Sequence, residues 1–218
     1  MLGDEDVCRS LTRIASSVCM ACACLSNDGQ QLNTGPGLLD LLLKAASHPS
    51  INICGIAIDV LGELVSSENG ITNQLLPILQ RRAITPHHFE INVLSLEASD
   101  ICSVNYHEFE NFRLTVLTDA LIACFKCNEE NYMTSCTAAI EEFCAATSSV
   151  EVSFHLEAAL YCIGSVSDKV IGGSFASSHI ASVKKCIKAL SEKPSSLKEN
   201  PLTLSQANIF VQKVCSTL

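Results

Sequence analysis

The chain has 218 residues, of which 48% are hydrophobic and only 17% are charged, and its formal net charge is −9. This apolar composition excludes a disordered chain and predicts a large packed interior. The negative charge argues against a duplex nucleic acid as partner, because phosphate neutralisation needs clustered Lys and Arg. Aromatic residues make up 5% and Trp is absent, which favours aliphatic packing between helices over a β-sheet protein.

The cysteines and the N-terminus predict the compartment. The thirteen cysteines are an odd number and most lie in apolar helical runs, so we interpret them as reduced packing residues. The N-terminal stretch is acidic, with Asp4, Glu5 and Asp6, where a signal or transit peptide would be basic. The apolar stretch 14–27 is shorter than the roughly 20 residues of a membrane-spanning helix. We therefore expect a cytoplasmic and nuclear protein with no transmembrane segment.

Apolar spacing predicts four helices in the first 84 residues. The first covers residues 6–27, and its apolar positions recur at helical spacing and predict a buried stripe: Val7, Leu11, Ile14, Val18, Cys22 and Leu25. A short helix over 38–46 stops before Pro49, and the next one follows at once with Ser50 as its expected N-cap. Such a short turn predicts an antiparallel pair. The fourth helix, 71–84, carries Pro77 near its first turns.

The second part of the chain predicts five further helices. Residues 85–105 lack a clean period, so we expect an extended connection with a short helical turn near 93–96. A helix over 106–127 has the apolar stripe Phe109, Phe112, Val116, Leu117, Leu121 and Phe125. The remaining helices are expected over 128–146, 153–171, 178–192 and 203–217.

The predicted helices form pairs that repeat. The second members of four successive pairs begin near residues 51, 106, 153 and 203, at a period of about 47 to 55 residues, just above that of HEAT and armadillo repeats. The sequence therefore predicts an all-α protein, an α-solenoid of HEAT-type antiparallel helix pairs (an ARM-repeat-like superhelix), with one segment of about four pairs over 1–218. A non-repetitive helical bundle is the alternative, because the repeats share no strict consensus.

Three segments carry a resemblance to a known family. They are Leu38-Leu39-Asp40-Leu41-Leu42-Leu43 with Ser47-His48-Pro49-Ser50 and Leu61-Gly62-Glu63-Leu64, then Phe109-Glu110-Asn111-Phe112-Arg113 with Asp119-Ala120-Leu121, then Glu157-Ala158-Ala159-Leu160-Tyr161-Cys162-Ile163 with Ser165-Val166-Ser167-Asp168-Lys169-Val170. In this order they resemble central repeats of the importin-β (karyopherin-β) superfamily, most nearly its transportin-3 and importin-13 branch.

The resemblance implies a nuclear transport receptor for protein import, and a fragment of a longer one. It implies protein cargo with basic or Arg/Ser-rich segments. It also implies the GTPase Ran as a partner of the full-length receptor, although the repeats that bind Ran are not recognisable here. It implies neither an enzyme nor a cofactor, and no direct contact with nucleic acid or a membrane. The alternative is a generic helical scaffold or assembly subunit without a transport role.

An acidic stretch supplies the candidate binding residues. Residues 96–157 contain eleven acidic and two basic side chains. Such an excess is usually a solvated helix surface, but solenoids recognise partners electrostatically on their concave side. The second helices of each pair line that side in the family that the chain resembles. We expect cargo to contact the residues opposite the apolar stripe of 106–127, which are Glu108, Asn111, Thr115 and Asp119.

Other chemistries have weaker support. The pairs Cys19/Cys22 and Cys124/Cys127 have the spacing of half a zinc site each, but they lie within helices about a hundred residues apart, so packing cysteines are favoured. Three other patterns suggest chemistry. His155 with Cys162 has the spacing of a nucleophile pair, His87-His88 could bind a metal, and Gly172-Gly173 could belong to a phosphate loop. None has the companion residues that its chemistry requires, so we assign no catalytic, cofactor-binding or metal-binding residue.

Overall fold

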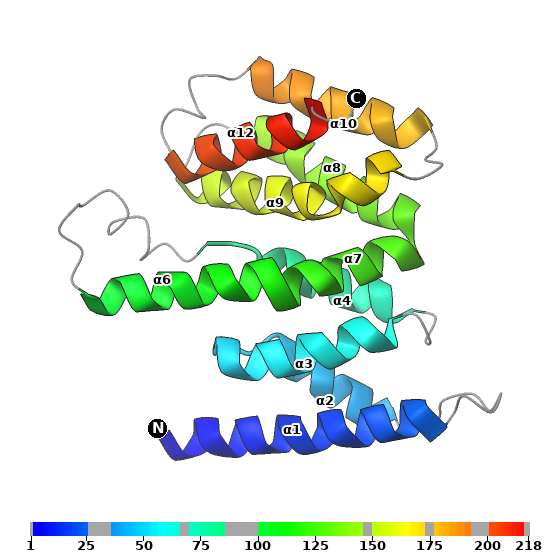
Figure 1. Cartoon of the computed structure of the whole chain (residues 1–218), viewed down its shortest axis with the longest axis vertical. Coiled ribbons are helices and arrows are strands. Elements are labelled where there is room, and N and C mark those ends of the chain that lie inside the picture. Colours follow the sequence, from blue (N-terminus) through cyan, green and yellow to red (C-terminus); the bar gives the residue numbers. More distant parts are fainter. Residues whose placement is uncertain are drawn as a thin grey trace. The chain divides into compact units, whose positions relative to one another are not determined.

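The computed structural model describes residues 2–25, 36–65, 70–85, 100–145, 150–172, 177–192 and 201–215. Within these ranges the regular elements are all helices and there is no strand (Figure 1). They are α1 (Leu2–Leu25), α2 (Pro36–Ala46), α3 (Ile51–Leu64), α4 (Ile71–Arg82), α6 (Asp100–Phe112), the π-helical turn η3 (Arg113–Leu117), α7 (Thr118–Cys127), α8 (Glu129–Ala145), α9 (Val150–Gly172), α10 (Ser177–Ser191) and α12 (Pro201–Cys215). The prediction of an all-α protein is confirmed.

The chain divides into two compact units. Unit 1 consists of Met1–Leu79 and Glu108–Cys127, and unit 2 consists of Gln80–His107 and Asn128–Leu218. The division therefore falls within α4 and within α6. The expectation of one continuous segment of four helix pairs stays a prediction.

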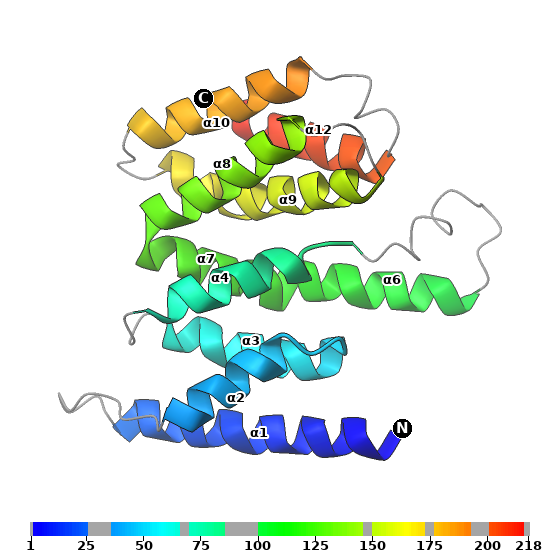
Figure 2. The same cartoon turned by 180° about the vertical axis from the view of Figure 1, so that it is seen from behind.

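The helix α3 is the centre of unit 1. It packs against α1 and α2, and also against η3 and α7 (Figures 1 and 2). It therefore buries residues over more than one stripe: Ile53, Cys54, Ala57, Ile58, Val60, Leu61 and Leu64. The two helices lie close together at Gly62, where an added Cβ would lie 3.3 Å from Ala120 Cα. A glycine at this position lets the two helices lie unusually close.

The helix α9 has the same role in unit 2. It packs against α8 and α12, and α10 packs against α8. Its described side chains from Phe154 to Ser167 are buried except for two that are half-buried, which is typical of a core helix. The Tyr132 hydroxyl of α8 donates a 2.7 Å hydrogen bond to the carbonyl of Cys162 in α9. This bond satisfies both polar groups inside the apolar core.

One local expectation was wrong, and the expected N-cap was confirmed in its position but not in its side-chain bond. Residues 100–105 are helical, so the helix that was expected from 106 begins at Asp100; residues 86–99, with the expected turn at 93–96, lie outside the described part. Pro77 lies in the interior of α4, where it removes one backbone hydrogen bond. Ser50 does occupy the N-cap position of α3 but makes no side-chain cap. Its hydroxyl instead donates a 2.6 Å hydrogen bond to Glu5 of α1.

The buried face of α1 was also predicted wrongly. The large residues Val7, Leu11, Ile14 and Val18 are 45% to 61% exposed. The residues that α1 buries are small ones, Thr12, Ala15, Ser16 and Cys19. Small side chains let α1 approach α2 and α3 closely. The buried Thr12 hydroxyl donates a 2.8 Å hydrogen bond to the Cys8 carbonyl of the same helix. The apolar stripe of α1 therefore faces away from the rest of unit 1.

Candidate functional site

The predicted binding residues lie on the long helix formed by α6, η3 and α7. Its buried residues include Phe109 and Phe112 before the π turn, Leu117 as the last residue of the turn, and Leu121 after it. Phe112 and Leu117 are five residues apart, which in a continuous α-helix places them about 140° apart. A π turn, with its i to i+5 hydrogen bonds, brings both onto the buried side.

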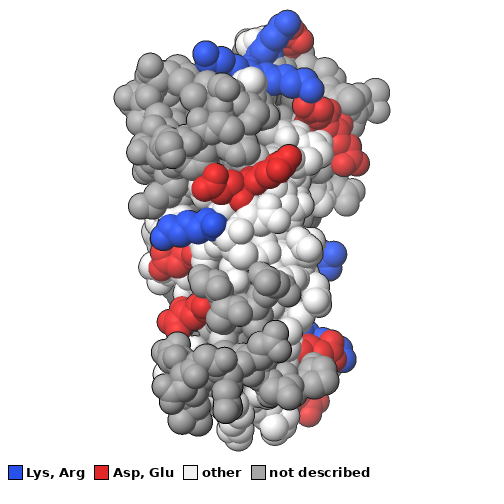
Figure 3. Space-filling view, turned by 90° about the vertical axis from the view of Figure 1, so that its right-hand side faces the viewer, with Lys and Arg blue, Asp and Glu red and all other residues white. Residues whose placement is uncertain are grey.

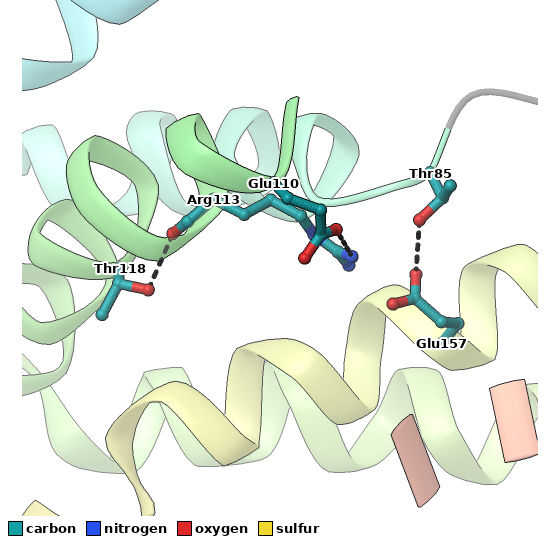
Figure 4. A network of polar contacts seen from close by, with 5 residues as sticks. All are labelled: Thr85, Glu110, Arg113, Thr118 and Glu157. Carbon is teal, nitrogen blue, oxygen red and sulfur yellow. Dashed lines mark hydrogen bonds and ion pairs between the residues drawn. The ribbon is translucent and has the colours of Figure 1, made fainter. Parts of the chain in front are cut away.

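The π turn is closed by hydrogen bonds that Thr118 donates to backbone carbonyls of the turn. The backbone N–H of Thr118 donates to the carbonyls of Arg113 and Thr115. The Thr118 hydroxyl donates a second bond to the Arg113 carbonyl at 2.8 Å (Figure 4). One turn earlier, the Thr115 hydroxyl donates to the Asn111 carbonyl at 2.7 Å. Both threonines thus use their hydroxyls to hold the backbone of this turn.

Arg113 is a buried cation at the start of the π turn. Its side chain is only 4% exposed and its Nη1 lies 3.3 Å from Glu110 Oε1 (Figure 4). Its guanidinium also lies over the Phe109 ring, 5.2 Å from the centroid, in cation–π geometry. These contacts offset part of the desolvation of the charge and fix the helix at this point. The burial of Arg113 was not predictable from the sequence, where the residue stands out only as part of a segment that carries the family resemblance.

The four candidate residues are all exposed. Glu108 and Asn111 come from α6, Thr115 from η3 and Asp119 from α7. They lie on the solvent side of a helix whose other side is core, as expected from its apolar stripe. Their proposed role in binding stays a prediction.

Two neighbours extend this surface. Leu114 is 68% exposed, the largest exposed fraction among the described large hydrophobic side chains. Glu63 of α3 is exposed and directly follows Gly62, whose added Cβ would contact Ala120, the residue after Asp119. Sequence reasoning missed both residues, because a large apolar residue such as Leu114 is expected in the core and Glu63 lies on a different helix. The set Glu63, Glu108, Asn111, Leu114, Thr115 and Asp119 is named here the α6–α7 face.

The charge on other surfaces is mixed. Figure 3 shows small groups of charged side chains on one side of the molecule, several of which combine acidic and basic residues. In unit 2, Lys185 of α10 lies 2.6 Å from Glu141 of α8. The hydrogen bond and the charge of Glu141 raise the pKa of Lys185. Acidic surface on α8 is thus partly neutralised, whereas the acids of the α6–α7 face form no ion pair among the described residues.

The cysteine pairs do not form a shared cluster. Cys19 and Cys124 are fully buried, and burial together with Cys127 raises the pKa of Cys124 to about 12. Cys127 is exposed and its thiol donates to the Val65 carbonyl at 3.5 Å. A buried thiol with so high a pKa is a poor metal ligand and a poor nucleophile, because both roles need the thiolate. Across the described ranges, no group of three or more His, Cys, Asp or Glu could hold a metal ion.

The remaining candidate sites are not brought together. Cys162 is fully buried, its carbonyl is bonded to Tyr132, and His155 is half-buried. His87-His88 lies outside the described residues, as does Gly173. A shallow pocket of about 340 Å³ lies in unit 1 and is lined by Asp40, Leu43, Lys44, Ser47, Gln74 and Ile78. Its two charged residues pair with each other at 2.7 Å, so it has no net charge to offer a ligand.

The helix α1 has the length and composition of a possible membrane span. Over Asp4–Cys24 it is long and apolar enough to cross a membrane, the one such helix in the described part of the chain, and 22% of the window is buried. One helix near the N-terminus is weak support for a membrane span, since core helices and signal sequences share these properties. Comparison with known proteins adds no assignment: no family model, curated protein or solved structure matches the chain.

Proposed function

We propose that this chain binds a partner protein through the α6–α7 face and recognises a basic segment of it. The main support is that one helix exposes all four candidate residues while its opposite side is core. These residues are Glu108, Asn111, Thr115 and Asp119. The hydrogen bonds of the π turn and the contacts of buried Arg113 restrain this helix, which favours a low entropy cost of binding. Exposed acids attract a basic segment, and Leu114 offers an apolar contact beside them.

We further propose that the binding serves nuclear import, as part of an importin-β-like receptor with HEAT-type repeats. The second helices of the pairs begin at residues 51, 100, 150 and 201, a nearly constant step of about 50 residues. The first helices of two successive pairs, α8 and α10, pack together, and so do the second helices, α9 and α12. Both features support a repeat architecture. The link to transport itself rests on the sequence resemblance.

A binding experiment with matched charge changes tests the proposal. The probe is a fluorescent Arg/Ser-rich peptide, with an uncharged peptide of equal length beside it. The double variant Glu108→Lys with Asp119→Lys should weaken binding by at least about tenfold, because it reverses two charges at the contact. The control, Glu130→Lys with Glu142→Lys, makes the same change of net charge on exposed residues of unit 2. It should stay within about twofold at 0.15 M salt, where the Debye length is about 8 Å.

The outcomes separate the possibilities. Equal weakening by both double variants would mean that only net charge matters, and it would reject the α6–α7 face as the site. Absence of binding by the wild-type chain even at low salt would reject cargo capture altogether. In that case the scaffold alternative gains support, and the exposed apolar stripe of α1 is the observation that favours it.

A further inference from the structure

The outer side of α1 has an apolar stripe that no described part of unit 1 covers. Val7, Leu11, Ile14 and Val18 are 57%, 52%, 61% and 45% exposed, four of the eight large hydrophobic residues exposed in the described part of the chain. In Figures 1 and 2, α2 and α3 lie on one side of α1 and no other element of unit 1 lies on the opposite side. Four such residues in one row are an exposed patch of the kind that marks an interaction surface.

The spacing of the stripe is that of a coiled-coil seam. The four residues are separated by steps of four, three and four, so they occupy alternating d and a positions of a heptad repeat. Some of the residues beside the seam are small, such as the exposed Ser10 and Ser17. Small flanking residues let a second helix approach closely. The stripe therefore fits another helix better than a loop or a flat surface.

The spacing and the sizes of the stripe residues fit a second copy of α1 as that helix. The pattern four, three, four reads the same in both directions, with Val at the two ends and the larger Leu11 and Ile14 in the middle. A second copy of α1 running antiparallel would therefore present the same stripe. Leu11 of each copy would face Ile14 of the other, and Val7 would face Val18. A two-fold symmetric contact requires such self-complementarity.

The charges of α1 select the antiparallel orientation. Asp4, Glu5 and Asp6 are exposed and lie at the N-terminal end, whereas the last described turn of α1 has no charged side chain. Parallel copies would bring the two acidic ends together. Antiparallel copies place each acidic end beside an uncharged end and also oppose the helix dipoles favourably. A membrane is a poorer occupant, because polar residues such as Arg13 and Ser17 flank the stripe.

We propose that the chain forms a symmetric homodimer through antiparallel pairing of the α1 stripe. The seam from Val7 to Val18 spans only about 17 Å of helix. Such a contact lies at the small end of protein interfaces, so the dimer is expected to be weak, with a Kd on the order of 10 to 100 µM. The dimer contact uses neither the α6–α7 face nor any of its residues. The test of the dimer is therefore independent of the test of the proposed function.

Sedimentation over 5 to 500 µM protein, in a reducing buffer that prevents disulfide dimers, tests the proposal. The wild type should shift from monomer to dimer. Ile14→Asp should remain monomeric, with an unchanged circular dichroism spectrum because the side chain is exposed. The matched control Ile209→Asp changes an Ile that is 42% exposed on α12 and should dimerise as the wild type does. A monomeric wild type, or loss of dimer in both variants, would overturn the proposal.

A mixing experiment tests the register. Leu11→Lys and Ile14→Asp should each be monomeric alone. When the two are mixed, antiparallel pairing brings the new ammonium of one copy onto the new carboxylate of the other, so a heterodimer should form. Parallel pairing offers no such contact, so absence of the heterodimer would reject the antiparallel register. Flotation of the monomer with anionic phospholipid vesicles, lost in Ile14→Asp, would assign the stripe to a membrane and overturn the dimer.

Discussion

Replacing Gly62 with Ala tests the close packing of α3 on α7. A Cβ at Gly62 would lie 3.3 Å from Ala120 Cα and 3.4 Å from Ala120 Cβ. The clash involves the backbone of a second helix, so it is relieved only by moving that helix and not by rotating a side chain. Gly55 supplies a matched control seven residues earlier in the same helix. There the new Cβ would meet only the Phe112 ring, at 3.9 Å, which is an ordinary contact.

Both substitutions gain about 1 kcal/mol from replacing a glycine inside a helix with alanine. Gly62→Ala adds an overpacking cost of about 1 to 3 kcal/mol. Gly55→Ala should therefore stabilise unit 1, and Gly62→Ala should be less stable than Gly55→Ala by about 1 to 3 kcal/mol. In thermal unfolding followed by circular dichroism, each kcal/mol corresponds to about 2 to 4 °C for a chain of this size. Equal midpoints for the two variants would refute the close-packing argument.

Two further predictions concern pH and the π turn. Burial raises the pKa of Cys124 from 9.0 to about 12, so its contribution to stability is complete below pH 9 and is lost between pH 9 and 12, at about 1.4 kcal/mol per pH unit. Urea unfolding at pH 8 to 11 should show a smaller loss of stability for Cys124→Ala than for the wild type, and parallel losses would contradict the raised pKa. Deleting Leu114, by contrast, removes one residue from the π turn and should leave the helix content and the thermal midpoint nearly unchanged. The control is deletion of the exposed Thr134 of α8, which has no π turn. It rotates the later residues of α8 by about 100° about the helix axis and should unfold unit 2. Equal damage by both deletions would argue against a π turn.

The helices were predictable because their apolar periods are strong. The starts of α3 at residue 51 and of α12 at residue 201 differ from expectation by two residues or fewer. The buried side of α1 was not predictable by the same rule. Hydrophobicity favoured the stripe with Ile14, whereas the structure buries the small Ala15 and Cys19 against α2 and α3. A single sequence shows which residues form stripes, but not which stripe its own neighbours cover.

The α6–α7 face was predictable only in part. The exposure of Glu108 and Asp119 followed from the helical period of their apolar neighbours. The π turn did not, because adjacent apolar residues at Val116 and Leu117 let an uninterrupted α-helix fit the pattern as well. The structure decides between them, since Leu117 is fully buried and Val116 is only half-buried. The contribution of Glu63 depended on tertiary contact between α3 and α7, which the sequence does not encode locally.

The two proposed surfaces of unit 1 differ in the force that would drive binding, and this makes them separable. The α1 stripe is apolar, so its contact depends on water exclusion, which salt strengthens slightly or leaves unchanged. The α6–α7 face would act through exposed carboxylates, whose attraction for a basic segment is screened as ionic strength rises. Raising NaCl from 0.05 to 0.5 M should therefore weaken peptide binding while the dimer persists. Loss of both together would mean that one surface serves both contacts, and that the structure has been divided wrongly into two sites.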